Sequence, residues 1–278
     1  MDASLRRLRG ILRQIGPCVV AFSGGVDSTL LLRVAHDVLG DGAIAATAVS
    51  PSLSRSEKRE AIALARLIGA HHLLIRTREL DDPRYVANDG RRCYFCKKEL
   101  FRVLRPLQTR SNGRPVVYGA IVDDLKDVRP GMQAANEAGA RAPLLEAGLD
   151  KNAVRALSRR LGLPTWDKPA MACLASRLPL MTPVTADALA LVDRAEQAVR
   201  ALGYRQVRVR HHGRRARIEL DAEGLTRAAG PAHRRALLDA VVGAGFADAD
   251  IDPRGYRPSG GDLTSVVLTG SGVGPGRH

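Results

Sequence analysis

Short apolar runs alternate with amphipathic segments along the first 165 residues of the chain. The apolar runs predict strands, and the segments in which apolar residues recur every three or four positions predict helices. We expect strands at 18–22, 43–49, 72–75 and 115–118, and helices at 28–39, 54–67, 93–107 and 151–161. This alternation predicts an α/β fold, a parallel sheet with helices on both faces and ligands at the carboxyl ends of the strands.

The order of elements changes after a break at residues 178–183, which holds two prolines. Beyond it the pattern predicts a helix at 185–202, strands at 205–210 and 216–220, a helix at 233–242 and a last strand at 248–251. These elements form a small α+β unit. We therefore expect a first domain over 1–180, a domain for substrate binding or homo-oligomerisation over 181–258, and a flexible tail over 259–278.

The composition favours anionic ligands. The formal net charge is +14, and 37 of the 43 basic residues are arginine, whose fork suits phosphate and carboxylate groups. A GC-rich genome would produce the same arginine content. Only 4% of the residues are aromatic, which argues against stacking on single-stranded nucleic acid. No apolar run is long enough to span a membrane, and the N-terminus has no apolar signal core, so we expect a cytoplasmic protein.

The strongest motif is Ser23-Gly24-Gly25-Val26-Asp27-Ser28, which lies between a predicted strand and a predicted helix. Its glycines let backbone N–H groups approach phosphate oxygens, and the start of the helix adds a positive end. Asp27 is anionic and suits magnesium or a partner group better than phosphate. The motif is neither a Walker loop nor a dinucleotide fingerprint. We predict a phosphate loop for ATP, and a tight turn without a ligand is the alternative.

Three of the four cysteines lie outside the predicted core strands. Cys93 and Cys96 form a C-x-x-C pair, Cys173 stands alone, and Cys18 is expected to be a buried apolar residue. Three thiolates can hold zinc together with a fourth ligand, or a four-iron cluster with one iron left open. A redox pair, a single reactive Cys173 and three unrelated structural cysteines are the alternatives. Arg177 is close enough in sequence to lower the pKa of the Cys173 thiol.

Taken together, these segments resemble the LarE family of ATP-dependent sulfur transferases, within the PP-loop superfamily of N-type ATP pyrophosphatases. The matching runs are SGGVDS (23–28), RCYFCKKELF (92–101), DDL (123–125), RPGM (129–132), APLLEA (142–147), GLPTWDKPAMACLASR (162–177), VRVRH (207–211) and GYR (255–257). The first run is shared by the whole superfamily, whereas the run around Cys173 and the arginine pair Arg208 and Arg210 are specific to the family. The resemblance implies an adenine nucleotide alpha hydrolase-like fold.

The resemblance also implies a reaction. ATP adenylates a carboxylate of pyridinium biscarboxylic acid mononucleotide, pyrophosphate leaves, and sulfur then replaces AMP to give a thiocarboxylate. The product leads to the nickel-pincer nucleotide cofactor of lactate racemase. In one version of the family a cysteine at the Cys173 position gives up its sulfur and becomes dehydroalanine. In another, three cysteines hold a [4Fe-4S] cluster whose open iron carries sulfide, and the presence of Cys93, Cys96 and Cys173 resembles that version.

The resemblance assigns roles to single residues. Four are expected to be catalytic: Asp27, Cys173, Ser176 and Arg177. Asp124 is expected to bind ATP together with the phosphate loop. The family usually has asparagine after the Gly119-Ala120 pair, whereas this chain has Ile121, so a hydrogen bond from that asparagine is lost.

Two further assignments concern substrate and magnesium. Arg208 and Arg210 are two positions apart on a predicted strand and therefore share a face. They are expected to bind the phosphate or carboxylates of the substrate, and a solvated strand face is the alternative. Magnesium is expected at Asp27 and at Glu219, although Glu219 could instead pair with Arg217.

Two other functions remain open. A tRNA thiolase of the same superfamily would also combine this loop with three cysteines, and the positive charge suits RNA. Those enzymes typically have a second C-x-x-C pair, which is not present here, so nucleic acid is not the expected partner. A non-catalytic nucleotide-binding or zinc-stabilised module is the second alternative.

Overall fold

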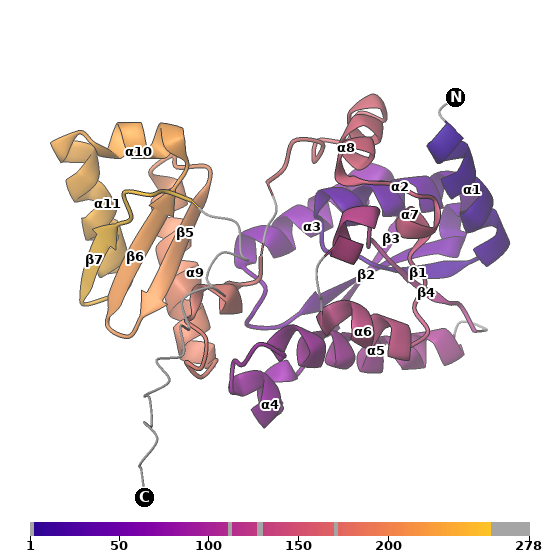
Figure 1. Ribbon diagram of the computed structural model, residues 1–278, viewed down its shortest axis with the longest axis horizontal. Helices are drawn as coiled ribbons and strands as arrows, with labels where there is room; N and C mark the ends of the chain where they lie inside the picture. Colours follow the sequence, from indigo (N-terminus) through magenta and orange to yellow (C-terminus); the bar gives the residue numbers. More distant parts are fainter. Residues whose placement is uncertain (1–2, 111–112, 127–129, 170–171, 257–278) are drawn as a thin grey trace, which may run out of the picture.

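The computed structural model describes residues 3–110, 113–126, 130–169 and 172–256, and two sheets organise it (Figure 1). The first contains the parallel strands β1 (Cys18–Ala21), β2 (Ala43–Val49), β3 (His71–Arg76) and β4 (Val116–Tyr118), in the order β3-β2-β1-β4. The second contains β5 (Val207–His212), antiparallel to β6 (Arg215–Leu220), which is parallel to β7 (Asp248–Ile251). The predicted α/β fold with a small C-terminal α+β unit is confirmed. The predicted tail at 259–278 lies outside the described residues.

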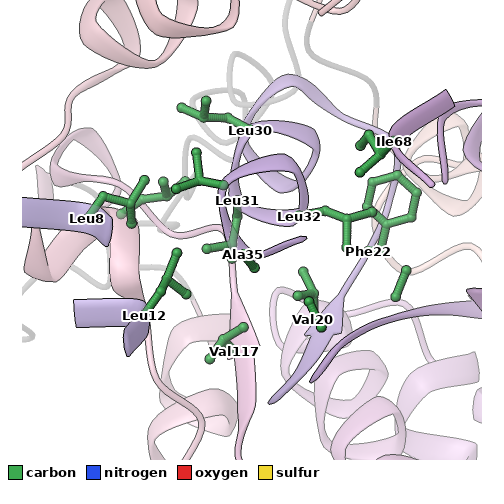
Figure 2. Close-up of a cluster of buried hydrophobic side chains, with 14 of the residues drawn as sticks. Leu8, Leu12, Val20, Phe22, Leu30, Leu31, Leu32, Ala35, Ile68 and Val117 are labelled. Carbon is green, nitrogen blue, oxygen red and sulfur yellow. The ribbon is translucent and has the colours of Figure 1, made fainter. Parts of the chain in front are cut away.

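Helices pack on both faces of the parallel sheet. One face is covered by α1 (Ala3–Ile15), α2 (Val26–Leu39), α3 (Arg55–Ile68), α7 (Pro143–Glu146) and α8 (Lys151–Arg160). The other face is covered by α5 (Arg92–Arg110) and α6 (Pro130–Glu137). Neighbouring residues of β1 point to opposite faces of the sheet and pack into the hydrophobic cores on those faces. Val20 packs under α2 (Figure 2), whereas Val19 packs with Leu104 of α5.

The remaining helices are short or belong to the small unit. Single turns are η1 (Gly40–Gly42), η2 (Glu79–Asp81), α4 (Pro83–Val86), η3 (Val122–Lys126) and η4 (Leu174–Arg177). The small unit adds α9 (Ala186–Ala201), α10 (Ala222–Ala228) and α11 (Pro231–Gly243). Its core also takes in residues from before the predicted boundary at residue 180, among them Tyr85, Phe95 and Leu174. The domain limits given above stay a prediction.

Helix α1 is an element that the sequence analysis does not predict. Its Leu5, Leu8 and Leu12 recur at helical spacing and are all buried, packed into the core beside α2. The charged residues between them make this stretch polar on average. A narrow apolar stripe of three leucines is nevertheless enough to attach the helix to the sheet.

The sheet order places the phosphate loop at a switch point. Strand β1 lies between β2 and β4. The chain leaves β1 into α2 on one face of the sheet, and it arrives at β4 from α5 on the opposite face. In open parallel sheets, ligands bind outside the carboxyl ends of the strands at this position. The loop at 23–28 follows β1, and the segment 119–124 follows β4, so both lie at the switch point.

A hydrogen-bond chain holds the residue that precedes this loop. The hydroxyl of Thr47 donates to the carbonyl oxygen of Phe22 over 2.7 Å and also lies 2.8 Å from Nε2 of His72. A hydroxyl has one proton to give, and the carbonyl can only accept, so Nε2 of His72 carries a proton and donates to Thr47. Strands β2 and β3 thereby fix the position from which the loop begins.

We expect the substitution His72→Gln to make stability less dependent on pH below about 6.5. Burial lowers the pKa of His72 from its ordinary value of 6.5, so the unfolded chain takes up this proton at a higher pH than the folded chain. The free energy of unfolding therefore decreases as the pH falls from about 6.5 toward the lowered pKa, by at most about 1.4 kcal/mol per pH unit. Glutamine can still donate to Thr47 but does not titrate.

Urea unfolding measured over this pH range should show a smaller loss of stability in the variant than in the wild-type protein. Identical losses in the two proteins would mean that His72 does not contribute.

Candidate functional site

The phosphate loop folds around the start of α2. The Ser23 and Ser28 hydroxyls lie 3.1 Å apart, and the Ser28 hydroxyl also donates to the carbonyl oxygen of Gly25 over 3.2 Å. Gly25 is the N-cap of α2 and has no side chain to cover the amides of the first turn. Those amides and the positive end of the helix dipole are suited to binding an anion.

Two glycines allow the close packing around this loop. Gly24 has a φ of +73°, and a Cβ there would lie 3.3 Å from the backbone of Ala61 in α3. A Cβ on Gly119 would lie 3.1 Å from the amide nitrogen of Ser28 and 3.2 Å from the carbonyl carbon of Asp27. The segment after β4 therefore packs directly on the start of α2, which places the expected Asp124 region next to the phosphate loop.

Asp124 shapes this neighbouring segment. Its carboxylate accepts a hydrogen bond from the backbone N–H of Ile121 over 3.0 Å. The Ile121 side chain itself is buried in the core below the loop, so this position is apolar where the resemblance leads us to expect asparagine. The next acid back, Asp123, accepts from the backbone N–H of Lys151 at the start of α8 over 2.7 Å.

Asp27 has a cationic partner that the sequence did not indicate. Both of its carboxylate oxygens lie 2.7 Å from Nζ of Lys151. The prediction named magnesium or a partner group for Asp27, and the structure shows a partner group. A magnesium ion at Asp27 stays a prediction.

A second lysine reaches the loop from the run that leads to Cys173. Nζ of Lys168 donates to the carbonyl oxygen of Gly24 over 2.9 Å and pairs with Glu60 of α3 at 2.9 Å. The main chain here is attached to α8, because Arg155 donates to the carbonyl oxygens of Trp166 and Lys168. The sequence analysis assigned no role to either lysine, although Lys168 lies inside the family-specific run.

Cys93, Cys96 and Cys173 lie near one another, because, besides burial, Cys173 and Cys93 both raise the pKa of Cys96 and Cys93 raises the pKa of Cys173. Cys93 and Cys173 are exposed and Cys96 is partly buried, whereas Cys18 is buried in β1, as predicted. Burial, and next the nearby Cys173, raise the pKa of Cys96 to about 12. Among the described residues, no three metal-binding side chains converge as they would on a single ion. The three sulfurs thus share a region without forming a single-ion site.

The Cys173 thiol differs from the prediction in one respect. Desolvation raises its pKa, although Arg92 and then Arg177 each act to lower it, while Cys93 raises it further. The expected lowering effect of Arg177 is present, but desolvation of the thiol outweighs it although Cys173 as a whole residue is exposed, so the net shift of the pKa favours the protonated thiol.

The segment around Cys173 is anchored by neighbouring elements. The N–H of Leu174 donates to the carbonyl oxygen of Ser52, in the loop after β2, over 2.9 Å. Arg92, next to Cys93, donates to the carbonyl oxygen of Ala175 over 2.9 Å and also to Asn88. Arg92 thus connects the start of α5, which carries the cysteine pair, to the third cysteine.

Arg177 and Glu196 form a buried ion pair beneath this segment. Nε of Arg177 lies 2.7 Å from Glu196 of α9, and the two side chains are 2% and 1% exposed. The same guanidinium donates to the carbonyl oxygen of Cys173 and to the hydroxyl of Ser176, each over 3.1 Å. Ser176 and Arg177, both expected to be catalytic, are therefore engaged in holding the Cys173 turn.

Glu196 is a residue that the sequence analysis missed. It lies on the face of α9 that also buries Val192 and Val199. An acid at a core position of an amphipathic helix requires a buried partner. The position of Glu196 on the apolar face of the predicted helix at 185–202 was therefore the signal in the sequence that could have revealed this pair.

The arginine pair of β5 lies on the same side of the small sheet. Arg210 pairs with Glu219 at 3.0 Å and donates to the carbonyl oxygen of Ser176 over 2.9 Å. Arg208 is buried with its guanidinium 4.4 Å from the ring centroid of Tyr256, and burial lowers its pKa. These arginines are not a solvated strand face, and Arg210 contacts the cysteine segment directly.

Glu219 requires a correction. The sequence analysis gave a pairing with Arg217 as the alternative to magnesium, but Glu219 binds Arg210, while Arg217 pairs with Asp250 of β7 at 3.1 Å. Arg217 lies opposite Arg210 in the antiparallel register, and Arg210 reaches the buried carboxylate on its own face. A magnesium ion at Glu219 stays a prediction.

None of the described helices is both long and apolar enough to cross a membrane. No protein-family model matches the chain. The chain is 45% identical over 267 residues to an uncharacterized protein of Synechocystis sp., covering 96% of this chain and 99% of that protein. It is 26% identical over 203 residues to an uncharacterized protein of Methanocaldococcus jannaschii, covering 73% and 77% of the two chains.

A third relative has a named activity. The chain is 40% identical over 210 residues to the pyridinium-3,5-bisthiocarboxylic acid mononucleotide synthase of Lactiplantibacillus plantarum, and the match covers 75% of this chain and 76% of that enzyme. Identity at this level over three quarters of both chains extends well beyond a shared phosphate loop. The chain therefore belongs to the LarE family of pyridinium-3,5-bisthiocarboxylic acid mononucleotide synthases.

Proposed function

We propose that this chain is an ATP-dependent sulfur transferase that forms pyridinium-3,5-bisthiocarboxylic acid mononucleotide from the corresponding biscarboxylic acid. The proposal follows from the relative whose name gives this product. One structural observation supports it above the others: Arg177, Arg210 and Lys168 connect the Cys173 segment both to the arginine pair of β5 and to the phosphate loop. The proposed ATP site, the proposed site for an anionic substrate and the cysteines thus belong to one set of contacts.

The proposed reaction requires ATP, the substrate carboxylate and a source of sulfur in one place. A carboxylate resists nucleophiles, because its charge repels them and oxide is a poor leaving group. In the first step a carboxylate oxygen bonds to the α-phosphorus of ATP, and the bond from that phosphorus to the bridging oxygen breaks, so that pyrophosphate leaves with the electron pair. In the second step sulfide sulfur bonds to the carboxyl carbon and AMP leaves with the carboxylate oxygen. Donors aimed at the departing phosphates stabilise the charge that develops.

The phosphate loop is the proposed ATP site. The uncapped amides at the start of α2 and the hydroxyls of Ser23 and Ser28 provide donors for phosphate oxygens. Asp27 is the proposed ligand for the magnesium ion that accompanies ATP, alongside its contact with Lys151. Asp124 contributes by holding the adjacent segment against the loop.

Cys93, Cys96 and Cys173 are the proposed ligands of a [4Fe-4S] cluster. Besides burial, Cys173 and Cys93 both raise the pKa of Cys96, and Cys93 also raises the pKa of Cys173, which fits a shared site. The ligands of a four-iron cluster are spread around a body of several atoms, so their sulfurs need not meet at one point as they would on a single ion. Such a cluster would supply an iron without a protein ligand, where sulfide can bind. The alternative source of sulfur is Cys173 itself, by breakage of its Cβ–Sγ bond.

We expect Asp27→Asn to abolish the release of pyrophosphate while the protein stays folded. The amide has the same shape but lacks the charge that attracts magnesium. The measurement is pyrophosphate release with ATP and substrate, and thermal unfolding checks the fold. Asp37→Asn is the matched control, because Asp37 lies in the same helix and pairs with Arg33 on the exposed side. Undiminished release in a folded Asp27→Asn protein would remove Asp27 from the mechanism.

For the cysteines, we expect alanine at position 93, 96 or 173 to remove iron, sulfide and the visible absorption of anaerobically purified protein. Binding of ATP should be retained, since the phosphate loop is untouched. Cys18→Ala is the control, because that thiol is buried in β1 away from the proposed site.

The two sources of sulfur give different outcomes in this experiment. If Cys93→Ala keeps full activity, and Cys173 loses the mass of one hydrogen sulfide after a single turnover, then Cys173 is the donor and the cluster assignment is wrong.

We expect Arg208→Ala and Arg210→Ala to weaken binding of the mononucleotide substrate about ten- to hundredfold, which corresponds to a lost charge-assisted contact of about 1.5–3 kcal/mol. Affinity for ATP should change little. Arg217→Ala, on the neighbouring strand, is the matched control.

Removal of Arg210 alone would leave the buried Glu219 carboxylate without its arginine, so the double variant Arg210→Gln, Glu219→Gln tests the same contact in a neutral pair. If isothermal titration gives wild-type substrate affinity in Arg208→Ala, in Arg210→Ala and in the double variant, this strand does not bind the substrate.

A further inference from the structure

The phosphate loop has no cation of its own. Its six residues, Ser-Gly-Gly-Val-Asp-Ser at 23–28, include an acid and no lysine or arginine. In the Walker loop, by contrast, a lysine inside the motif reaches the β- and γ-phosphates. A triphosphate on the loop of this chain therefore needs positive charge from other elements.

Two lysines reach the loop, and their contacts differ. Lys151 is engaged with both oxygens of Asp27, each at 2.7 Å, so its charge is matched by a carboxylate of the loop itself. Lys168 donates to a neutral carbonyl oxygen, that of Gly24, over 2.9 Å. Its other partner, Glu60, has a side chain that is 45% exposed, whereas the side chain of Lys168 is 13% exposed.

The contacts of Lys168 are of a kind that a phosphate can replace. The ammonium of Lys168 is attracted more strongly by an anionic phosphate oxygen than by a neutral carbonyl oxygen, because two opposite charges then interact instead of a charge and a dipole. An ion pair with an exposed carboxylate contributes little, because water screens it. The main chain at Lys168 stays in place in either case, since Arg155 holds the Lys168 carbonyl oxygen at 2.9 Å.

We propose that Lys168 binds the pyrophosphate portion of ATP and neutralises the charge that develops on it as it leaves. This inference rests on the proposed function, in which ATP occupies the loop at 23–28. The ammonium would exchange the Gly24 carbonyl and Glu60 for β- or γ-phosphate oxygens. Lys168 is then a catalytic residue supplied by the cysteine-containing run rather than by the phosphate loop.

The test compares Lys168→Met with the wild-type protein in binding ATP, pyrophosphate and AMP, each measured by isothermal titration. We expect affinity for ATP and for pyrophosphate to fall about ten- to hundredfold. Affinity for AMP, which lacks the β- and γ-phosphates, should change by less than about twofold. Lys168→Arg should recover most of the affinity for pyrophosphate, because it restores the charge.

Two controls separate this role from others. Lys58→Met removes the same charge from α3, the helix that carries Glu60, and should leave all three affinities unchanged. Glu60→Gln removes the competing partner of Lys168 and should not weaken the binding of pyrophosphate.

The outcomes are distinct. If Lys168→Met binds pyrophosphate as tightly as the wild-type protein, this inference is wrong while the proposed ATP site stands. If all three ligands weaken equally, Lys168 only holds the loop in shape, and the inference is again wrong. If the folded wild-type protein binds neither ATP nor pyrophosphate, the proposed function and this inference both fail.

Discussion

The buried ion pair between Arg177 and Glu196 is the contact on which the arrangement of the site depends. Moving two charges out of water is costly, and a buried pair is stable only when its remaining donors and acceptors are also satisfied. Here Glu196 additionally accepts from Arg200 at 3.0 Å and from the N–H of Val209 over 3.2 Å, while Arg177 donates to the turn at Cys173. One pair thus joins α9, β5 and the cysteine segment.

The rest of the site extends from this pair in two directions. On one side, Arg210 attaches β5 to the Ser176 carbonyl oxygen, which places the arginine pair beside the cysteine segment. On the other side, the same run of chain reaches back to the phosphate loop through Lys168. A sulfur transferase that first activates a carboxylate with ATP must bring nucleotide, acceptor and sulfur to one place. In this fold, Lys168 contacts the phosphate loop and Ser176 contacts β5, so the described parts of one run of chain reach both places where the proposed reaction needs them.

The sequence predicted those features that depend on local pattern. The bounds of β2 and β7 were predicted without error, and the phosphate loop was recognisable because its residues are consecutive and its strand and helix flank it. Helix α1 was missed because its three leucines are separated by charged residues. Contacts between distant residues could not be read from spacing: Lys151 meets Asp27 across 124 positions, and Lys168 meets Gly24 across 144. The sequence indicated that Arg177 lowers the pKa of Cys173, and it does so, but the larger and opposite effect of desolvation could not be read from the sequence.

The central step of the proposed reaction is the formation of an acyl adenylate on the carboxylate of the mononucleotide, and the fate of one carboxylate oxygen tests it most directly. Substrate labelled with oxygen-18 in its carboxylates would be incubated with ATP and the protein, and the products separated for mass spectrometry. Attack of the carboxylate on the α-phosphorus, followed by displacement of AMP by sulfur, transfers one labelled oxygen to the phosphate of AMP and leaves pyrophosphate unlabelled. Label found in pyrophosphate, or AMP formed without label while the thiocarboxylate appears, would contradict this reaction.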